Sequence, residues 1–223
     1  MSRILVVGAG GVGASMASIA ETRSFFDHFV LADINEQRCI DALKALDNPT
    51  RFSTAKVDAS NKADIVALAK AQKIDIIVNA CDPRLNDPIF EAAYEAGCTY
   101  VDMAMNLSKP HPTNPYNEVG KPLGEAQLAA DPQWREKGLL ALVGMGVEPG
   151  LSNVFARYAA DHLFDTIDEI GVRDGSNLSI DGFEFAPTFS IWTTIEECLN
   201  PPIVWEKSRG LFTTECFSEP EVF

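Results

Sequence analysis

Basic side chains are scarce in this chain. Its 223 residues include 18 Lys and Arg against 32 Asp and Glu, which gives a formal net charge of −14. Proteins bind the polyanionic backbones of nucleic acids mainly through Lys and Arg, so we expect no nucleic-acid partner. Long apolar runs are missing too, because four glycines interrupt the run that follows Arg3, and it is too short to cross a bilayer. We therefore expect no signal peptide and no membrane partner.

Cysteine and histidine are few, and they are not spaced as ligands. The five cysteines contain no Cys-x-x-Cys pair, and the three histidines have no metal-ligand spacing with one another or with a cysteine. We expect neither a metal site nor a disulfide framework. Reduced thiols are typical of a cytoplasmic protein, and this is the location that we predict.

The chain does contain an alternation of short β-branched runs and helical patterns. Strands are expected at residues 3–7, 29–32, 52–57, 74–78, 100–103 and 139–143. In the first helical pattern, apolar residues recur at Val12, Met16, Ile19 and Ala20. Strands separated by helices form a parallel sheet that is covered on both faces. The sequence thus predicts an α/β fold, with a Rossmann doubly wound parallel sheet over residues 1–147.

Two segments depart from this alternation. Residues 106–131 hold four prolines and predict a long loop, which could be a lid or binding loop or a family-specific insertion. After Gly150, apolar spacing predicts an amphipathic helix over residues 151–163. Two strands are expected at residues 167–172 and 183–191, and a short helix at 193–199. We place the start of an α/β substrate domain, which also serves dimerisation, at residues 148–223.

The segment Gly8-Ala9-Gly10-Gly11-Val12-Gly13 is a Gly-x-Gly-x-x-Gly motif between a predicted strand and a predicted helix. Gly8 allows a tight turn, Gly10 lets a pyrophosphate approach the backbone, and Gly13 lets the helix pack closely on the strand. The helix N-terminus supplies free N–H groups to the phosphates. A glycine-rich turn that binds nothing is the alternative. The motif predicts that Gly8, Gly10, Gly11, Val12 and Gly13 bind a dinucleotide.

Asp33 lies 20 positions after Gly13, at the end of the second predicted strand. A carboxylate there accepts hydrogen bonds from the adenosine ribose and repels a 2′-phosphate. The sequence therefore predicts NAD as cofactor. NADP stays possible because Arg38 is close in sequence, and a role for Asp33 as a helix cap is the alternative.

Residues that follow the other strands are expected at the same edge of the sheet. Asp58 and Ala59 follow the third strand and are predicted to flank the adenine, although Asp58 could equally be a turn residue. Ala80 and Cys81 follow the fourth strand, near the predicted nicotinamide ribose. Cys81 could equally be a small buried filler. Asp102 ends the fifth strand.

The glycine-rich segment 144–150 joins the sixth strand to the amphipathic helix. Such a segment can act as a hinge. Glu148 is placed where it could hold a substrate ammonium group or a reacting water. In the alternative, it caps the next helix, with Pro149 at the first helical position.

Several of these stretches resemble the saccharopine dehydrogenase family, which includes saccharopine reductases, carboxynorspermidine dehydrogenases and lysine 6-dehydrogenase-like enzymes. The resemblance is carried by GAGGVG, the Asp33 strand, VDAS, NACDP, TYVDMA, GVEPGLSN and FAPTFSIWTTIEE. It implies a Rossmann domain joined to an α/β substrate domain that mediates dimerisation, hence a homodimer. It also implies NAD(P)-dependent oxidation or formation of a C–N bond. Members are longer, so we expect the chain to be truncated inside its second domain.

The resemblance also implies roles for single residues. Gly8, Gly10, Gly13, Asp33 and Asp58 would bind the cofactor, and Glu148, Pro149 and Gly150 would lie at the catalytic cleft. Other branches of the family carry an aspartate in place of Glu148. The resemblance therefore implies an amino-acid-like substrate but not its exact identity.

Hydride transfer at an amine carbon needs a base that takes a proton from the ammonium group and guides water. Asp102 and Glu148 are the candidate catalytic residues. Pro149, Gly150 and Arg173 are the candidate substrate residues. The resemblance places Pro149 and Gly150 at the cleft, and the guanidinium of Arg173 could pair with a substrate carboxylate. A structural salt bridge explains Arg173 equally well. The rival functions are a reductase of a carbonyl or double bond, and a non-catalytic NAD-binding scaffold.

Overall fold

The computed structural model describes residues 1–173, 179–184, 191–218 and 220. The chain forms two compact units. The first contains Met1–Leu107 and Gly124–Phe164, and the second contains Ser108–Leu123 and Asp165–Phe223. The predicted boundary between cofactor and substrate domains, at residues 147 and 148, concerns function and stays a prediction.

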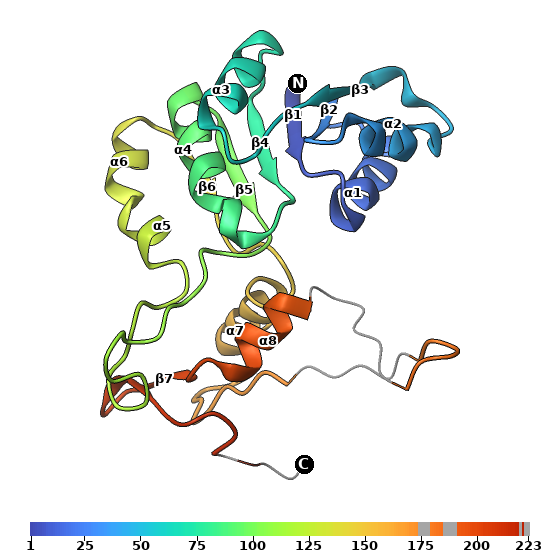
Figure 1. The fold of residues 1–223 in the computed structure, drawn as a ribbon. Coiled ribbons are helices and arrows are strands. Elements are labelled where there is room, and N and C mark those ends of the chain that lie inside the picture. Colours follow the sequence, from blue (N-terminus) through green and yellow to red (C-terminus); the bar gives the residue numbers. More distant parts are fainter. Residues whose placement is uncertain (174–178, 185–190, 219, 221–223) are drawn as a thin grey trace. The chain divides into compact units, whose positions relative to one another are not determined.

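A six-stranded parallel sheet forms the centre of the first unit (Figure 1). The strand order is β3-β2-β1-β4-β5-β6. The strands are β1 (Ser2–Val7), β2 (Phe26–Asp33), β3 (Phe52–Lys56), β4 (Ile76–Asn79), β5 (Thr99–Asp102) and β6 (Ala141–Leu142). The chain order reverses between β1 and β4, and ligands of such sheets bind beside this reversal, at the carboxyl ends of the strands. The predicted Rossmann fold is confirmed.

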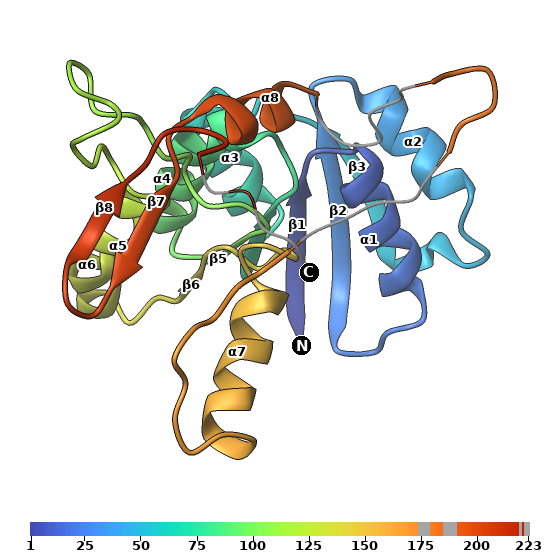
Figure 2. The same cartoon turned by 90° about the horizontal axis from the view of Figure 1, so that it is seen from below.

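Helices cover both faces of this sheet. On one face lie α1 (Gly11–Glu21) and α2 (Glu36–Lys44), and on the other lie α3 (Lys62–Ala71) and α4 (Asn86–Ala96) (Figure 2). The side chains of Asn35 and Asn61 cap α2 and α3 by accepting hydrogen bonds from first-turn amides. Gly97 ends α4 in a left-handed conformation, with φ of 76°.

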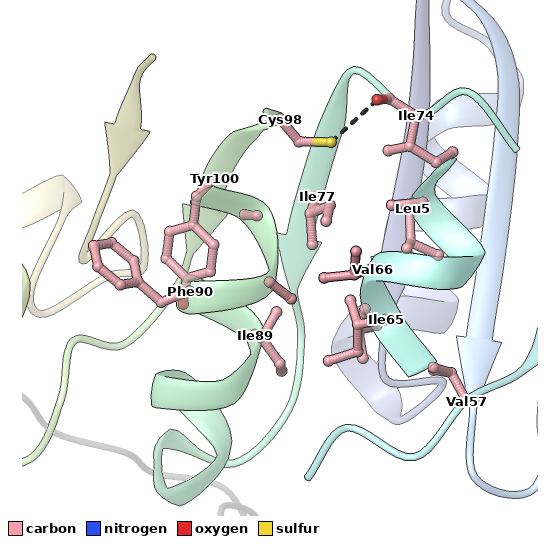
Figure 3. Packing of buried hydrophobic residues seen from close by; sticks show 14 of the residues in the cluster. Leu5, Val57, Ile65, Val66, Ile74, Ile77, Ile89, Phe90, Cys98 and Tyr100 are labelled. Atoms are coloured by element: carbon pink, nitrogen blue, oxygen red, sulfur yellow. Dashed lines mark hydrogen bonds between the residues drawn. The ribbon is translucent and has the colours of Figure 1, made fainter. Parts of the chain in front are cut away.

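Buried apolar side chains hold these layers together. On the α3 and α4 face, Leu5 and Ile77 from the strands pack with Ile65, Ile89 and Tyr100 (Figure 3). Fully burying one such aliphatic side chain contributes about 1.5–3 kcal/mol relative to leaving it in water. The opposite face has its own cluster, which contains Val6, Leu31, Ala17 and a group of three phenylalanines, Phe26, Phe29 and Phe52.

The buried face of α1 differs from the one that its apolar pattern predicts. Gly13, Ala17 and Ala20 are buried, whereas Val12 and Ile19 are exposed. A Cβ atom on Gly13 would lie 1.9 Å from the carbonyl oxygen of Gly8. The helix lies so close to the turn that only small residues fit between them, and this contact sets the rotation of α1.

Two short helices lie between β5 and β6 along the chain. In the predicted loop 106–131, the structure contains α5 (Glu125–Ala129), which is followed by α6 (Asp131–Glu136). The first unit ends with α7 (Leu151–His162), as its apolar spacing predicts. A five-residue helix such as α5 is too short to show a period of 3.6 residues, so the sequence does not predict it.

The second unit contains α8 (Ile191–Leu199) and an antiparallel hairpin of β7 (Ile203–Glu206) and β8 (Gly210–Thr213). The helix expected at residues 193–199 is part of α8. The strand expected at residues 167–172 is wrong, because this segment has no regular structure and its β-branched side chains are exposed. The strand expected at residues 183–191 lies partly outside the described residues; residues 183 and 184 are not in a strand.

None of the helices that the structure describes is long and apolar enough to cross a membrane.

Candidate dinucleotide-binding site

The glycine turn follows directly from β1. Gly8 has φ of +107°, and its N–H donates a hydrogen bond of 2.7 Å to the carbonyl oxygen of Ala32. A Cβ atom on Gly8 would lie 2.7 Å from the carbonyl oxygen of Ala80. Both the backbone conformation and the lack of space require glycine. The turn therefore directs the chain from β1 into the start of α1.

The N-terminus of α1 faces open space. Gly10 precedes the helix, and no side chain of the described residues caps it, in contrast to α2 and α3. In the described part of the chain, a Cβ atom on Gly10 would meet nothing closer than the Arg38 guanidinium at 3.9 Å, and one on Gly11 would meet nothing within 4 Å. Unpaired first-turn amides and the positive end of the helix dipole form an anion site. A pyrophosphate fits this position.

Asp33 connects the end of β2 to the glycine turn. Its Oδ2 accepts a hydrogen bond of 2.8 Å from the N–H of Ala9, and its Oδ1 accepts one of 2.9 Å from the N–H of Asn35. The guanidinium of Arg38 lies 4.0 Å from Oδ2. A carboxylate has about four lone-pair sites, so these contacts leave acceptor capacity for ribose hydroxyls.

A cavity of about 310 Å³ lies at the carboxyl ends of β1, β2, β3 and β4. It brings together Gly8, Gly10, Asp33, Asp58, Ala59, Ala80 and Cys81, all of which the sequence predicts as cofactor residues. Gly11, Val12 and Gly13 form the adjacent first turn of α1. The sequence does not predict two further lining residues, Ile34 and Leu85. Ile34 directly follows Asp33 at the end of β2, whereas Leu85 lies in the turn between β4 and α4. Neither aliphatic side chain carries binding chemistry of its own that a sequence pattern could indicate.

Two carboxylates at this cavity are held by neighbouring residues. Ser60 donates from its hydroxyl at 2.7 Å and from its N–H at 2.9 Å to Asp58, and these bonds lower the pKa of Asp58. Arg84 binds both carboxylate oxygens of Asp82 at 2.8 and 2.9 Å and lowers the pKa of that group. Both groups are thus anions at neutral pH.

Cys81 lies against the glycine turn, where a Cβ atom on Gly8 would be 3.0 Å from its Sγ. Its thiol donates to the carbonyl oxygen of Val7 at 3.3 Å. Burial, followed by the charges of Asp33 and Asp82, raises its pKa to about 12. A neutral thiol is a poor nucleophile, so Cys81 shapes the cavity and carries no thiolate chemistry at neutral pH.

Asp102 lies at the end of β5 and is 1% exposed. Its Oδ1 accepts a hydrogen bond of 2.6 Å from the N–H of Gly144, and its Oδ2 accepts one of 2.7 Å from Nε2 of Gln127. Burial raises the pKa of Asp102, against the opposing effect of donors from Gly144, Gln127 and Tyr100. The predicted catalytic role of Asp102 stays a prediction.

A group of buried polar side chains lies beside Asp102. Nδ2 of Asn79 donates to Oδ1 of Asn86 at 2.7 Å and to the Tyr100 hydroxyl at 3.2 Å. Nδ2 of Asn86 donates at 2.7 Å to the carbonyl oxygen of Ala104. These bonds join β4, α4, β5 and the segment after β5. The sequence does not predict this group, because each partner is distant along the chain.

The segment 144–150 folds back on itself before α7. The N–H of Gly146 donates to the carbonyl oxygen of Pro149 at 3.0 Å, and a Cβ atom on Gly146 would lie 2.4 Å from the carbonyl oxygen of Met103. Glu148 is exposed, Pro149 is partly buried and Gly150 is buried. The helix α7 begins at Leu151, so Glu148 and Pro149 both precede it.

Arg173 is exposed and belongs to the second compact unit, so its predicted contact with substrate stays a prediction. In the described part of the chain, no group of three or more His, Cys, Asp or Glu side chains is placed to hold a metal ion.

A doubly wound parallel sheet with an open glycine turn and an acid at the end of β2 defines a dinucleotide-binding α/β domain. Residues 4–142 match the family described as the saccharopine dehydrogenase NADP binding domain, and the chain belongs to the saccharopine dehydrogenase family. This match confirms the predicted family and the predicted nicotinamide cofactor.

The relatives that match are longer than this chain. Carboxynorspermidine synthase from Vibrio cholerae serotype O1 is 30% identical over 211 residues, which cover 91% of this chain and 50% of the relative. Carboxyaminopropylagmatine dehydrogenase from Synechocystis sp. is 32% identical over 197 residues, which cover 88% of this chain and 47% of the relative. The chain thus spans about half the length of the curated relatives that it matches.

Among solved structures, apo saccharopine dehydrogenase (L-Glu forming) from Saccharomyces cerevisiae has a similar fold. The TM-score is 0.55 at 12% identity, over 73% of this chain and 31% of that one. At this identity the likeness concerns the fold alone.

Proposed function

We propose that the protein is an NAD(P)-dependent oxidoreductase that transfers a hydride to or from the carbon of a C–N bond in an amino-acid-like substrate. The observation that carries the proposal is the uncapped α1 N-terminus, open above Gly10 and Gly11, in a chain of the saccharopine dehydrogenase family. Relatives named for carboxynorspermidine and carboxyaminopropylagmatine support a substrate that bears both an amine and a carboxylate.

The bound nicotinamide would accept or supply the hydride at the substrate carbon. In the oxidative direction, the amine loses a hydride from carbon and a proton from nitrogen to give an imine, which water hydrolyses to a carbonyl compound and a free amine. The proton needs a base. Glu148 is our first candidate, because its side chain is exposed on the segment that follows β6. Asp102 is the second, and Pro149, Gly150 and Arg173 would contact the rest of the substrate.

We propose NAD as the preferred cofactor. The Asp33 carboxylate lines the cavity at the end of β2, where an anion opposes a 2′-phosphate. Arg38 lines the same cavity and offsets part of this charge. Calorimetric titration with NADH and NADPH would test the preference, and tighter binding of NADPH would overturn it.

We also propose a cytoplasmic homodimer. All five cysteines are free, which suits a reducing compartment. Leu151, Val154, Phe155 and Tyr158 on α7 are exposed apolar residues, which are typical of an interface. Sedimentation velocity measurements would test the oligomeric state, and a concentration-independent monomer would contradict the dimer.

The reaction class can be tested with purified protein, NAD and a panel of amines that includes lysine and saccharopine. Growth of the reduced-nicotinamide absorbance band with one of these amines supports the proposed reaction. NAD binding without turnover of any amine supports a non-catalytic scaffold instead. Consumption of NADH or NADPH with a carbonyl or alkene compound in the absence of amine supports the other reductase class.

A further inference from the structure

The side chain of Gln127, on α5, joins two segments of the first unit. It is 5% exposed. Its Nε2 donates a hydrogen bond of 2.7 Å to Oδ2 of Asp102, and its Oε1 accepts one of 2.8 Å from the N–H of Asn106. One end of the side chain must donate and the other must accept, which a glutamine does and a glutamate anion does not.

Asp102 carries this connection on to the segment 144–150. Its Oδ1 accepts from the N–H of Gly144 at 2.6 Å, and its main-chain carbonyl accepts from the N–H of Met145 at 2.8 Å. Two consecutive amides of the segment thus hydrogen-bond to a single residue at the end of β5.

The Asp102 carboxylate depends on its donors. A buried carboxylate is costly unless hydrogen bonds replace its lost water. Nε2 of Gln127 is the donor to Oδ2 of Asp102, and the Tyr100 hydroxyl is a further side-chain donor to the carboxylate. Without the Gln127 donor, the carboxylate would take up a proton or move toward water, and in either case its bond with Gly144 would weaken.

The segment has little freedom to compensate for such a change. Gly144 has φ of +67°, and a Cβ atom on it would lie 3.0 Å both from Cγ of Met105 and from Cγ of Pro149. The backbone of residues 144–150 therefore packs closely on the residues that follow β5, so a shift at Gly144 reaches Pro149 and its neighbour Glu148.

We propose that Gln127 and Asp102 form a positioning pair that sets the backbone of residues 144–150 and thereby the position of Glu148. The proposal rests on the proposed function, because the assignment of Glu148 as base gives the segment its catalytic meaning. Gln127 would act through Asp102 and Gly144 and would not touch the substrate.

Amide hydrogen exchange tests the pair in the full chain. In Gln127→Ala, the Asp102 carboxylate loses the hydrogen bond from Gln127. Because loss of a hydrogen bond to a charged group is costly, the protection factors of the Gly144 and Met145 amides should fall by about tenfold or more. The Gly8 amide, which bonds Ala32 in the glycine turn, serves as an internal reference and should change little. Gln133→Ala, at an exposed glutamine on α6, is the matched control and should leave all three amides unchanged.

Gln127→Glu gives a sharper test. At neutral pH two carboxylates would face each other, and protection of Gly144 should fall as in the alanine variant. In acid, the neutral carboxylic acid can donate its O–H to Asp102 and accept from Asn106, as the amide does. Protection, corrected for intrinsic exchange, should therefore recover in acid for Gln127→Glu but not for Gln127→Ala.

The other titratable groups at the pair do not mimic this recovery. Burial raises the pKa of Tyr100, so its hydroxyl stays neutral. Asp87, which accepts from Nδ2 of Asn106, is present in every variant. Wild-type and Gln127→Ala chains measured at the same pH values therefore report any contribution from these groups.

The outcomes separate the pair from the function on which it rests. Unchanged protection of Gly144 and Met145 in both variants overturns the proposal, as does an equal loss at Gly8, or a Gln127→Glu chain that shows no recovery in acid. If Gln127→Ala does not fold, the pH titration of Gln127→Glu decides alone. Failure of the wild-type chain to bind any nicotinamide dinucleotide would defeat the proposed function and leave the exchange result intact.

Discussion

The N–H of Ala9 donates to the Asp33 carboxylate at 2.8 Å, so a single side chain joins the glycine turn to the end of β2. The same carboxylate lines the cavity where a ribose is expected. Asp33 therefore has a structural contact and a predicted binding contact, and its variants must separate the two.

Asp33→Asn and Asp33→Ala should do so. Asparagine keeps one oxygen that can accept from Ala9, whereas alanine keeps none. We expect Asp33→Ala to weaken NADH binding by about tenfold or more, as for loss of hydrogen bonds to a charged group, with the fold retained. Titration calorimetry measures the affinity and circular dichroism the fold. Unchanged affinity in the alanine variant would refute the ribose contact.

Gly8 and Gly10 offer a matched comparison of stability and binding. Gly8→Ala places a Cβ atom 2.7 Å from a carbonyl oxygen at φ of +107°, so the free energy of unfolding should fall by about 2–4 kcal/mol. Gly10→Ala has φ of −74° and no contact below 3.9 Å, so stability should be kept while pyrophosphate access is blocked. Denaturant unfolding and NADH titration measure the two quantities. A Gly10→Ala chain that binds NADH as tightly as wild type would exclude phosphates from this turn.

Cys81 should resist alkylation. Its pKa of about 12 keeps it a thiol near neutral pH, and only the thiolate reacts readily. With iodoacetamide at pH 8, we expect the exposed Cys198 to be labelled well before Cys81. Peptide mass spectrometry measures both sites in one sample. Equal labelling rates in the folded chain would show that the partly buried Cys81 thiol is not protonated as described.

Asp102 should give stability a specific pH dependence. Burial raises its pKa in the folded chain above the ordinary value of 3.8. Between the two pKa values the folded state binds more protons than the unfolded state, so the contribution of Asp102 to the unfolding free energy decreases as pH rises through this window. Above the folded pKa the contribution is constant.

Asp102→Asn removes that titration. The unfolding free energy of wild type minus that of the variant should therefore decrease as pH rises from about 3.8, the unshifted pKa, and then level off. Urea unfolding at a series of pH values measures the difference. A difference that is independent of pH would contradict a raised pKa for Asp102.

Local patterns explain why much of the site could be predicted from the sequence. The Gly8–Gly13 motif and Asp33 each depend on neighbours in one βαβ unit, so their spacing predicts their place. The rotation of α1 could not be predicted from the apolar period. Gly13 lies against the Gly8 carbonyl, and this contact outweighs the burial of Val12 and Ile19.

Polar side chains with distant partners escape such patterns. Gln127 and Asp102 are 25 positions apart, and Asn86 contacts Ala104 across 18 positions. No local spacing indicates either contact. The β-branched run at residues 167–172 gives a local pattern that predicts a strand where the structure has none. Strand propensity reflects packing against neighbours, and the exposed Ile170 and Val172 belong to no strand in the described structure.

The close contact between Gly13 and Gly8 also bears on how a ligand enters. Backbone against backbone leaves α1 little room to slide or roll on the sheet. We therefore expect its first amides to keep their direction when an anion binds. A preorganised anion site of this kind loses little conformational entropy when it is filled. Dinucleotide affinity at this turn is then set by the contacts themselves, with little cost for ordering the protein.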